Sequence, residues 1–230
     1  RRLAMKLLNA SKFALAQGVH AGLVGQVGSV THDLDRALLV RLGEVTASAT
    51  EHMAAYDYAH ALREVESFFW EFTDDYVELV KDRSYGAGTE EDQLSAHVTL
   101  ATALDVLLRL FAPIMPFVTE EVWSWWRTGS VHRAPWPGRE QLIDPMGSVD
   151  PGLLTSVAAV LSEIRRAKTE AKVSQKTPVL SLSIEAPAQI TGAVASAEGD
   201  LKAAGRVQTL TTDVGGDAIT ISAIEFEPQA

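Results

Sequence analysis

The residues best suited to chemistry lie near the N-terminus, spaced by three or four positions. They are Arg2, Lys6, Asn9 and Phe13, with Lys12 beside them. At about 100° per residue the first four fall within about 60° of arc on one side of a helix. An unpaired RNA loop is recognised by such groups, because cations meet phosphates, an amide meets a base edge and a ring stacks on a base. The competing interpretation is that Phe13 packs against another domain and that the charges are solvated surface.

A second group of cations lies in the last third of the chain. Arg165, Lys168 and Lys172 share one face of a predicted helix, where they are candidates to hold backbone phosphates. The chain as a whole is acidic, with a net charge of −10. Residues 1–32, however, carry four basic side chains and no acidic one. Long-range steering of a nucleic acid is therefore expected to be weak, and phosphate contacts are expected to be local, at the two groups of cations.

Other chemistry finds little support. The chain has no cysteine, which excludes disulfides, thiol nucleophiles and Cys-ligated zinc. A phosphate-binding loop and a zinc-protease motif are missing, and the glycines within 18–28 follow no strand. His52 and His60 are eight positions apart with a turn predicted between them, so a metal pair is not expected. We predict no catalytic residue, no metal site and no cofactor within these 230 residues.

The first 147 residues are predicted to form a helix bundle that positions the N-terminal stripe. Thr31 or Asp33 is available to cap the second helix, and Thr89 to begin the fourth. Three tryptophans at 123, 125 and 126 cannot all point inward, so one should sit at an edge. The predicted helices cover residues 2–16, 32–54, 57–83, 89–111 and 116–126.

A Gly- and Pro-rich loop over residues 127–149 separates the bundle from a small α+β domain. We place the boundary near Gly147, which gives domains at 1–147 and 148–230. The smaller domain is predicted to hold helices over 150–172 and 188–204 and strands over 179–184, 207–211 and 218–226. No apolar run approaches the roughly 20 residues that a membrane span needs, and no signal peptide is evident. The predicted fold class is mainly α, a bundle followed by a small α+β domain.

Several segments, in order along nearly the whole chain, resemble the anticodon-binding region of class I aminoacyl-tRNA synthetases of the valyl type. Pro116-Phe117-Val118-Thr119 is the version most similar to valyl enzymes. The similar segments are residues 1–13, 68–81, 110–123, 132–137 and 164–176.

The resemblance implies an anticodon-binding bundle that docks on the anticodon stem-loop of a tRNA, with tRNA-Val the expected partner. The catalytic signatures of class I synthetases, the nucleotide-binding fold and the editing domain are missing, so a parent enzyme would supply them and use ATP. It further implies a catalytic domain in the parent chain as partner, a monomer, a cytoplasmic location and no membrane. Residues 81–85 would also suit an isoleucyl enzyme, which leaves the isoleucyl and leucyl families open. A helical protein-interaction module that binds no RNA is the alternative of another class.

Overall fold

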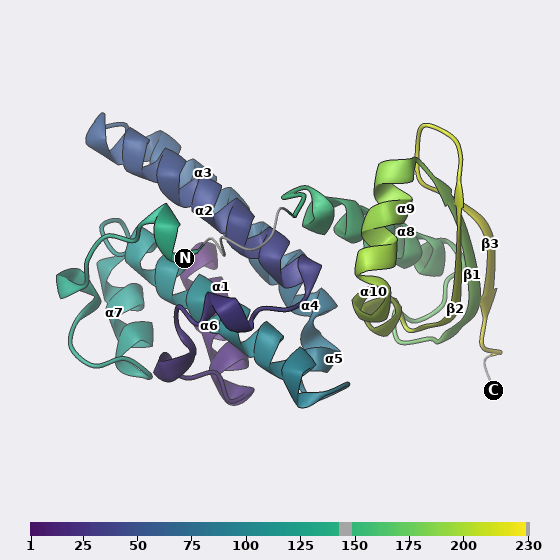
Figure 1. Cartoon of the computed structure of the whole chain (residues 1–230), viewed down its shortest axis with the longest axis horizontal. Coiled ribbons are helices and arrows are strands. Elements are labelled where there is room, and N and C mark those ends of the chain that lie inside the picture. Colours follow the sequence, from purple (N-terminus) through teal and green to yellow (C-terminus); the bar gives the residue numbers. More distant parts are fainter. Residues whose placement is uncertain (143–148, 229–230) are drawn as a thin grey trace.

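The computed structural model describes residues 1–142 and 149–228, which form a helix bundle and a smaller α/β unit (Figure 1). The predicted fold class is confirmed. The bundle contains α1 (Arg2–Ala16), α2 (Asp33–Ala54), α3 (Tyr58–Trp70), η3 (Glu71–Tyr76), α4 (Val77–Leu79), α5 (Lys81–Ser84), α6 (Glu90–Phe111) and α7 (Pro116–Ser124). Short 3₁₀ turns lie between α1 and α2, as η1 (Ala21–Leu23) and η2 (Val27–Ser29), and after α7, as η4 (Val131–Arg133) and η5 (Arg139–Gln141).

Helix α6 is the core of the bundle, and nearly every side chain from Ser95 to Phe111 is buried. Its length and hydropathy satisfy the requirements for a membrane span, contrary to our expectation that no segment would do so. Of its most apolar stretch, 83% is buried inside the bundle. Burial by neighbouring helices therefore accounts for its apolar composition.

The helix starts follow the predicted capping in one case and not in the other. Thr89 and Asp92 form a reciprocal capping box at the start of α6, as Thr89 led us to expect. At α2 neither Thr31 nor Asp33 caps the helix, because His32 is the cap residue and its side chain makes no capping bond. The Ser95 hydroxyl instead accepts hydrogen bonds from the backbone N–H groups of Thr31 and His32, at 3.1 and 3.3 Å.

The long helix predicted over residues 57–83 is interrupted. Its middle is the π-helical segment η3, and a break at Val80 separates α4 from α5. Within η3 the rings of Phe72 and Tyr76 stack at 5.9 Å, and both are buried. The Tyr76 hydroxyl donates a 2.8 Å hydrogen bond to Asp35 of α2. The wider turn thus serves a buried polar contact that hydrophobic periodicity does not encode.

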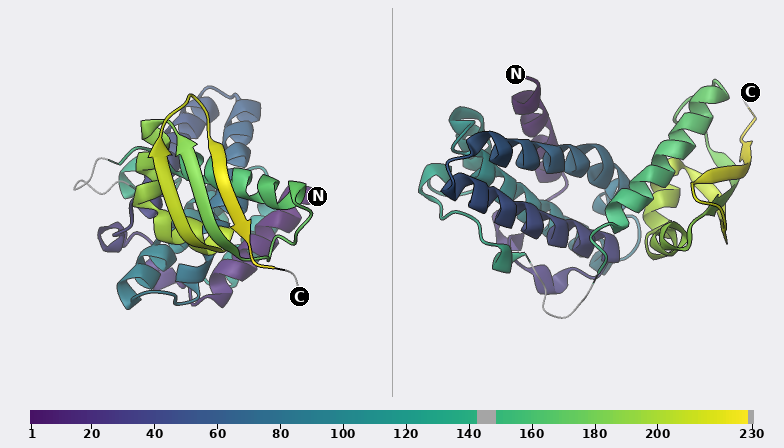
Figure 2. Two further views of the ribbon diagram at one scale, coloured as in Figure 1. Left: turned by 90° about the vertical axis from the view of Figure 1, so that its right-hand side faces the viewer. Right: turned by 90° about the horizontal axis from the view of Figure 1, so that it is seen from above.

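The α/β unit is a three-stranded sheet covered on one face by helices (Figure 2). Strand β1 is central, pairing in parallel with β2 and antiparallel with β3. The predicted helix over 188–204 is broken at Ala197, and the first helix ends at Glu170, short of Lys172. The elements are α8 (Leu153–Glu170), β1 (Val179–Ala186), α9 (Ala188–Ser196), α10 (Glu198–Gly205), β2 (Val207–Val214) and β3 (Thr220–Phe226).

A buried ionic network joins this unit to the bundle. The guanidinium of Arg83 in α5 donates to both carboxylate oxygens of Asp200 in α10, at 2.7 and 2.9 Å. It also donates to both oxygens of Asp35 in α2, at 2.9 and 2.8 Å. All three side chains are buried. The proposed boundary at Gly147 falls outside the described residues, so domains at 1–147 and 148–230 remain a prediction.

Candidate nucleic-acid interface

Helix α1 presents the predicted stripe as expected from its periodicity. Leu7 and Ala14 are buried, and Leu3, Leu8, Ala10 and Leu15 pack partly buried against the core. The Ser11 hydroxyl is also buried and donates to the carbonyl of Leu7 at 2.7 Å. This inner face packs on α6 and α7. The opposite side of α1 carries the stripe, in which Arg2, Asn9 and Lys12 are exposed and Lys6 and Phe13 are half-buried.

The first half of the stripe meets one indole ring. The Arg2 guanidinium lies 5.0 Å, and the Lys6 ammonium 5.9 Å, from the ring centre of Trp70 at the end of α3. Lys6 also forms a 2.6 Å ion pair with Asp74 of η3. Both side chains of this pair remain partly exposed, at 35% and 51%. Lys6 is therefore held by an aromatic face and an acid that an incoming phosphate would have to replace.

Further along the helix, Asn9 and Lys12 are exposed. The Lys12 ammonium lies 5.8 Å from the ring centre of Trp125. Trp125 is the tryptophan at the edge, since Trp123 is buried and Trp126 is half-buried. Our expectation for the three tryptophans is confirmed, with Lys12 as the neighbour of the outer ring.

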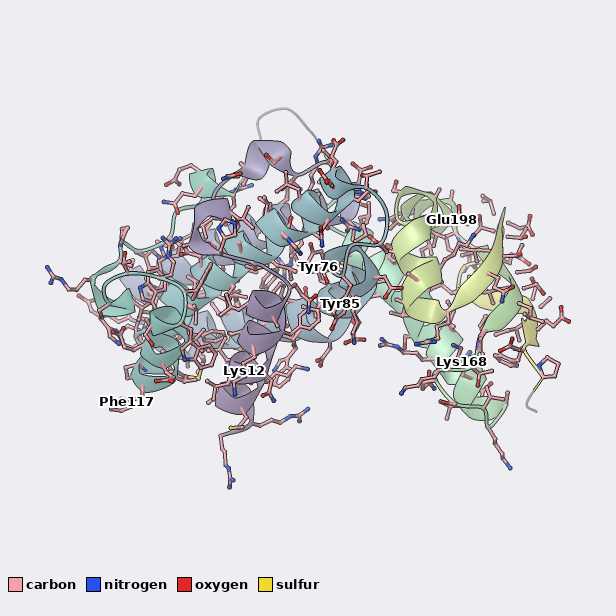
Figure 3. All side chains as sticks on the ribbon, turned by 90° about the horizontal axis from the view of Figure 1, so that it is seen from below. Lys12, Tyr76, Tyr85, Phe117, Lys168 and Glu198 are labelled. Carbon is pink, nitrogen blue, oxygen red and sulfur yellow. The ribbon has the colours of Figure 1, made fainter. Side chains whose placement is uncertain are left out.

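Phe13 differs from the expectation of a freely exposed ring. It is half-buried against the core, and its ring packs edge to face with Tyr85 at 6.1 Å and 78°. Tyr85 follows α5 and is 62% exposed. Both Tyr85 and Lys12 are seen in Figure 3, where Tyr85 lies next to α1. The aromatic part of the stripe is thus a pair of rings from two distant segments.

The second group of cations is only partly available, and our expectation for Lys168 is wrong. Lys168 is 1% exposed, and its ammonium donates to the carbonyls of Gln175 and Gly205 at 3.1 and 2.9 Å. Burial lowers the pKa of Lys168, and the nearby charges of Arg206 and Arg165 act in the same direction. Lys168 therefore joins two backbone segments inside the α/β unit and cannot contact a phosphate.

Arg165 shares a face of α8 with Lys168 as predicted, but Lys172 does not. Lys172 lies beyond the end of α8, where its backbone φ is +55°, and its side chain is exposed. Arg165 is half-buried, and its charge acts on Asp75 of the bundle. Burial raises the pKa of the Asp75 carboxyl, and Arg165 partly opposes that rise. Arg165 therefore lies near enough to Asp75 of the bundle for their charges to interact.

Three aromatic residues, Trp70, Tyr85 and Trp125, lie beside α1 although the sequence did not predict that they would meet it. Their neighbours in the sequence are mostly core residues, since Phe68 and Phe69 precede Trp70 and Trp123 precedes Trp125, and all three of these neighbours are buried. Tyr85 stands alone before Gly86, and its position at a helix end was a signal for exposure. Their proximity to the stripe depends on helix packing, which one-dimensional spacing does not contain.

His52 and His60, which were not expected to form a metal pair, lie side by side in the structure. The α2–α3 hairpin stacks the rings of His52 and His60 at 5.4 Å, next to Asp57. Within residues 1–142 and 149–228, no group of three or more potential ligands has the geometry to hold a metal ion.

Comparison with known proteins identifies the family of the chain. A family model described as the anticodon-binding domain of tRNA ligase matches residues 35–185. The chain belongs to this family. The matched residues run from the first turn of α2 through β1, so the stripe on α1 lies outside the family model.

Relatives of this anticodon-binding domain extend the match to α1. The valine–tRNA ligase of Cutibacterium acnes is 45% identical over 232 aligned residues, which cover 100% of this chain and 26% of that protein. Those of Salinispora tropica and Thermobifida fusca are 46% and 44% identical, covering 92% and 99% of this chain. The chain thus spans about a quarter of the length of the relatives that it matches.

Proposed function

We propose that this anticodon-binding domain recognises the anticodon stem-loop of tRNA-Val as part of a valine–tRNA ligase. The observation that carries the proposal is the stripe on α1, where cations and an amide lie beside aromatic rings that are exposed or half-buried. Three of its side chains, Arg2, Lys6 and Lys12, each lie over or beside an aromatic ring. Cations interleaved with rings suit a single-stranded loop, which offers both phosphates and unstacked bases.

The individual roles follow from side-chain chemistry. Arg2, Lys6 and Lys12 contact phosphates, and Asn9 hydrogen-bonds a base edge. Phe13 belongs to the aromatic part of the site. Arg165 and Lys172 hold backbone phosphates farther along the tRNA, with Lys172 the more accessible of the two.

The remainder of the proposal concerns the longer protein. Its catalytic domain joins valine to tRNA-Val with ATP, and its editing domain hydrolyses wrong products. This chain fixes the position of the anticodon and thereby orients the distant acceptor end. We further propose that the enzyme acts as a cytoplasmic monomer, in which the catalytic domain is the chain's own neighbour.

The test is competition between purified tRNAs. The 230-residue chain is titrated with labelled tRNA-Val in a gel-shift assay at several salt concentrations, with unlabelled tRNA-Val, tRNA-Ile or tRNA-Leu as competitor. Binding should weaken as salt rises, and tRNA-Val should compete at the lowest concentration. Preferential competition by tRNA-Ile or tRNA-Leu would assign the domain to one of those enzymes. A failure to shift any tRNA at low salt would contradict RNA recognition and favour a protein-interaction module.

A further inference from the structure

We infer that Tyr85, and not Phe13, presents the ring on which an unpaired tRNA base stacks, and that Phe13 is its positioning residue. This inference rests on the proposed function and assigns a residue within the same surface. It begins with exposure. Tyr85 is 62% exposed, whereas Phe13 is half-buried and packed against the core. A base needs an accessible ring face, and the half-buried ring of Phe13 offers less of one than the exposed ring of Tyr85.

The backbone around Tyr85 is held on both sides. The Ser84 carbonyl accepts hydrogen bonds from Gln93 and His97 of α6, at 3.2 and 3.0 Å. On the other side, Gly86 adopts a φ of +94° and its N–H donates to the carbonyl of Arg83 at 2.9 Å. Arg83 is itself fixed by the buried carboxylates. An aromatic side chain on a fixed backbone loses little conformational freedom when a ligand stacks on it.

The ring of Tyr85 packs against the ring of Phe13 and remains largely exposed. Phe13 meets it at 78°, the edge-to-face geometry that aromatic pairs prefer. Within residues 1–142 and 149–228, no hydrogen bond engages the Tyr85 hydroxyl. An exposed ring that is ordered by a neighbour and otherwise uncommitted is suited to a π-stacking ligand.

The charges nearby favour nucleic acid as that ligand. Phe13 and Lys6 lie seven residues apart on one side of α1, which is about 10 Å along a helix. A base stacked on Tyr85 would therefore place its neighbouring phosphates over the cations of α1. Residues 1–32 contain no acidic side chain, and the acid that Asp74 of η3 brings to this surface is paired with Lys6.

The experiment measures binding of an anticodon stem-loop of tRNA-Val that carries 2-aminopurine at one loop position at a time. Tyr85→Ala and Tyr85→Leu should each weaken binding by about 5- to 150-fold, because one stacked base is lost. Tyr85→Phe should bind within about twofold of the wild type, because the ring remains. At one loop position, the quenching of 2-aminopurine fluorescence seen with the wild type and Tyr85→Phe should be lost with Tyr85→Leu. Tyr58→Ala is the matched control, since Tyr58 is 50% exposed and lies on the α2–α3 hairpin. It should not change binding.

Phe13→Leu separates positioning from stacking. It keeps apolar volume at a half-buried site but removes the aromatic contact with Tyr85, so binding should weaken by less than with Tyr85→Ala. Wild-type affinity of folded Tyr85→Ala and Tyr85→Leu, alongside weakened binding by Lys6→Ala, would overturn the inference and leave the proposed function standing. If the wild-type chain binds no stem-loop at low salt, the proposed function fails and this inference fails with it.

Discussion

At the scale of single residues, the cations of α1 are restrained before any ligand arrives. Lys6 is paired with Asp74 at 2.6 Å, so a phosphate must compete with a carboxylate for the same ammonium. We predict that Asp74→Asn tightens binding of tRNA-Val by up to about fivefold, since exposed pairs contribute about 0–1 kcal/mol. Filter-binding titration at low salt measures the change.

A matched control for this variant is Glu78→Gln. It removes one negative charge from the same region, but its partner at 3.6 Å is Lys81 and not a residue of α1. If both variants tighten binding equally, the effect comes from net charge alone. Release of Lys6 requires that Asp74→Asn have the larger effect.

The contribution of Lys6 to phosphate binding is measured through salt. Each phosphate contact made by a cation releases counterions, so Lys6→Ala should lower the slope of log affinity against log salt by about one. Lys202→Ala should leave the slope unchanged, because Lys202 lies on α10 beside Glu198. An unaltered slope in Lys6→Ala would remove Lys6 from the contact surface.

The sequence predicted the stripe on α1 but not the aromatic residues that pack beside it. Helical periodicity alone placed Arg2, Lys6 and Asn9 on one side of α1, and the structure has them there. It failed for Lys168 because spacing gives the direction of a side chain but not what covers it. The carbonyl of Gly205, 37 positions away, makes Lys168 a buried structural residue. Trp70 and Tyr85 were missed for the same reason, because only packing brings them to α1.

At the scale of elements, α6 depends on its N-terminal capping box. The Thr89 hydroxyl accepts from the Asp92 N–H, and the Asp92 carboxylate accepts from the Thr89 N–H. Thr89→Ala should lower the free energy of unfolding by about 1 kcal/mol, the usual effect of losing such a cap. Urea denaturation followed by circular dichroism gives this value, and Thr89→Ser should restore most of the loss.

The same cap predicts a pH dependence. The hydrogen bond from the Thr89 backbone, followed by that from His32, lowers the pKa of Asp92 from 3.8 to about 2. A depressed acid pKa stabilises the folded state above the unfolded value, and that contribution is lost as pH falls through about 2. Asp92→Asn should therefore flatten the stability profile between about pH 4 and pH 2 relative to the wild type. Parallel profiles for the two proteins would contradict the assignment.

Element boundaries could be predicted where local signals act alone. The Thr89 cap and the Pro116 start were visible in the sequence because each works through its own backbone. The π-helical turn at η3 could not be predicted in this way, because it accompanies a buried contact between Tyr76 and Asp35, which are 41 positions apart. The break at Ala197 between α9 and α10 was likewise hidden within an Ala-rich run.

At the scale of the whole molecule, Arg83 bridges the bundle and the α/β unit through two buried carboxylates. Its guanidinium satisfies Asp35, which is 0% exposed, and Asp200, which is 6% exposed. Removing one partner of a buried ion pair leaves an uncompensated charge, which costs about 3–5 kcal/mol. We predict that Arg83→Ala lowers the free energy of unfolding by that amount in chemical denaturation.

Asp200→Asn tests the joint between the units more selectively, because Asp35 keeps its bonds to Arg83 and Tyr76. The bundle should remain folded, while the amides of α10 should exchange with solvent faster because their contact with α5 is weakened. Hydrogen exchange read by mass spectrometry compares α10 with α6, which lies within the bundle core. Glu198→Gln serves as control, since it alters only an exposed pair with Lys202 on the same helix. If α6 and α10 lose protection together, the bundle and the α/β unit unfold as one unit. The contact between Arg83 and Asp200 would then not stabilise α10 separately from the bundle. Selective loss of protection in α10 would indicate that this buried ionic network holds the α/β unit in place. Lys172 would then be positioned relative to the stripe on α1 through that network.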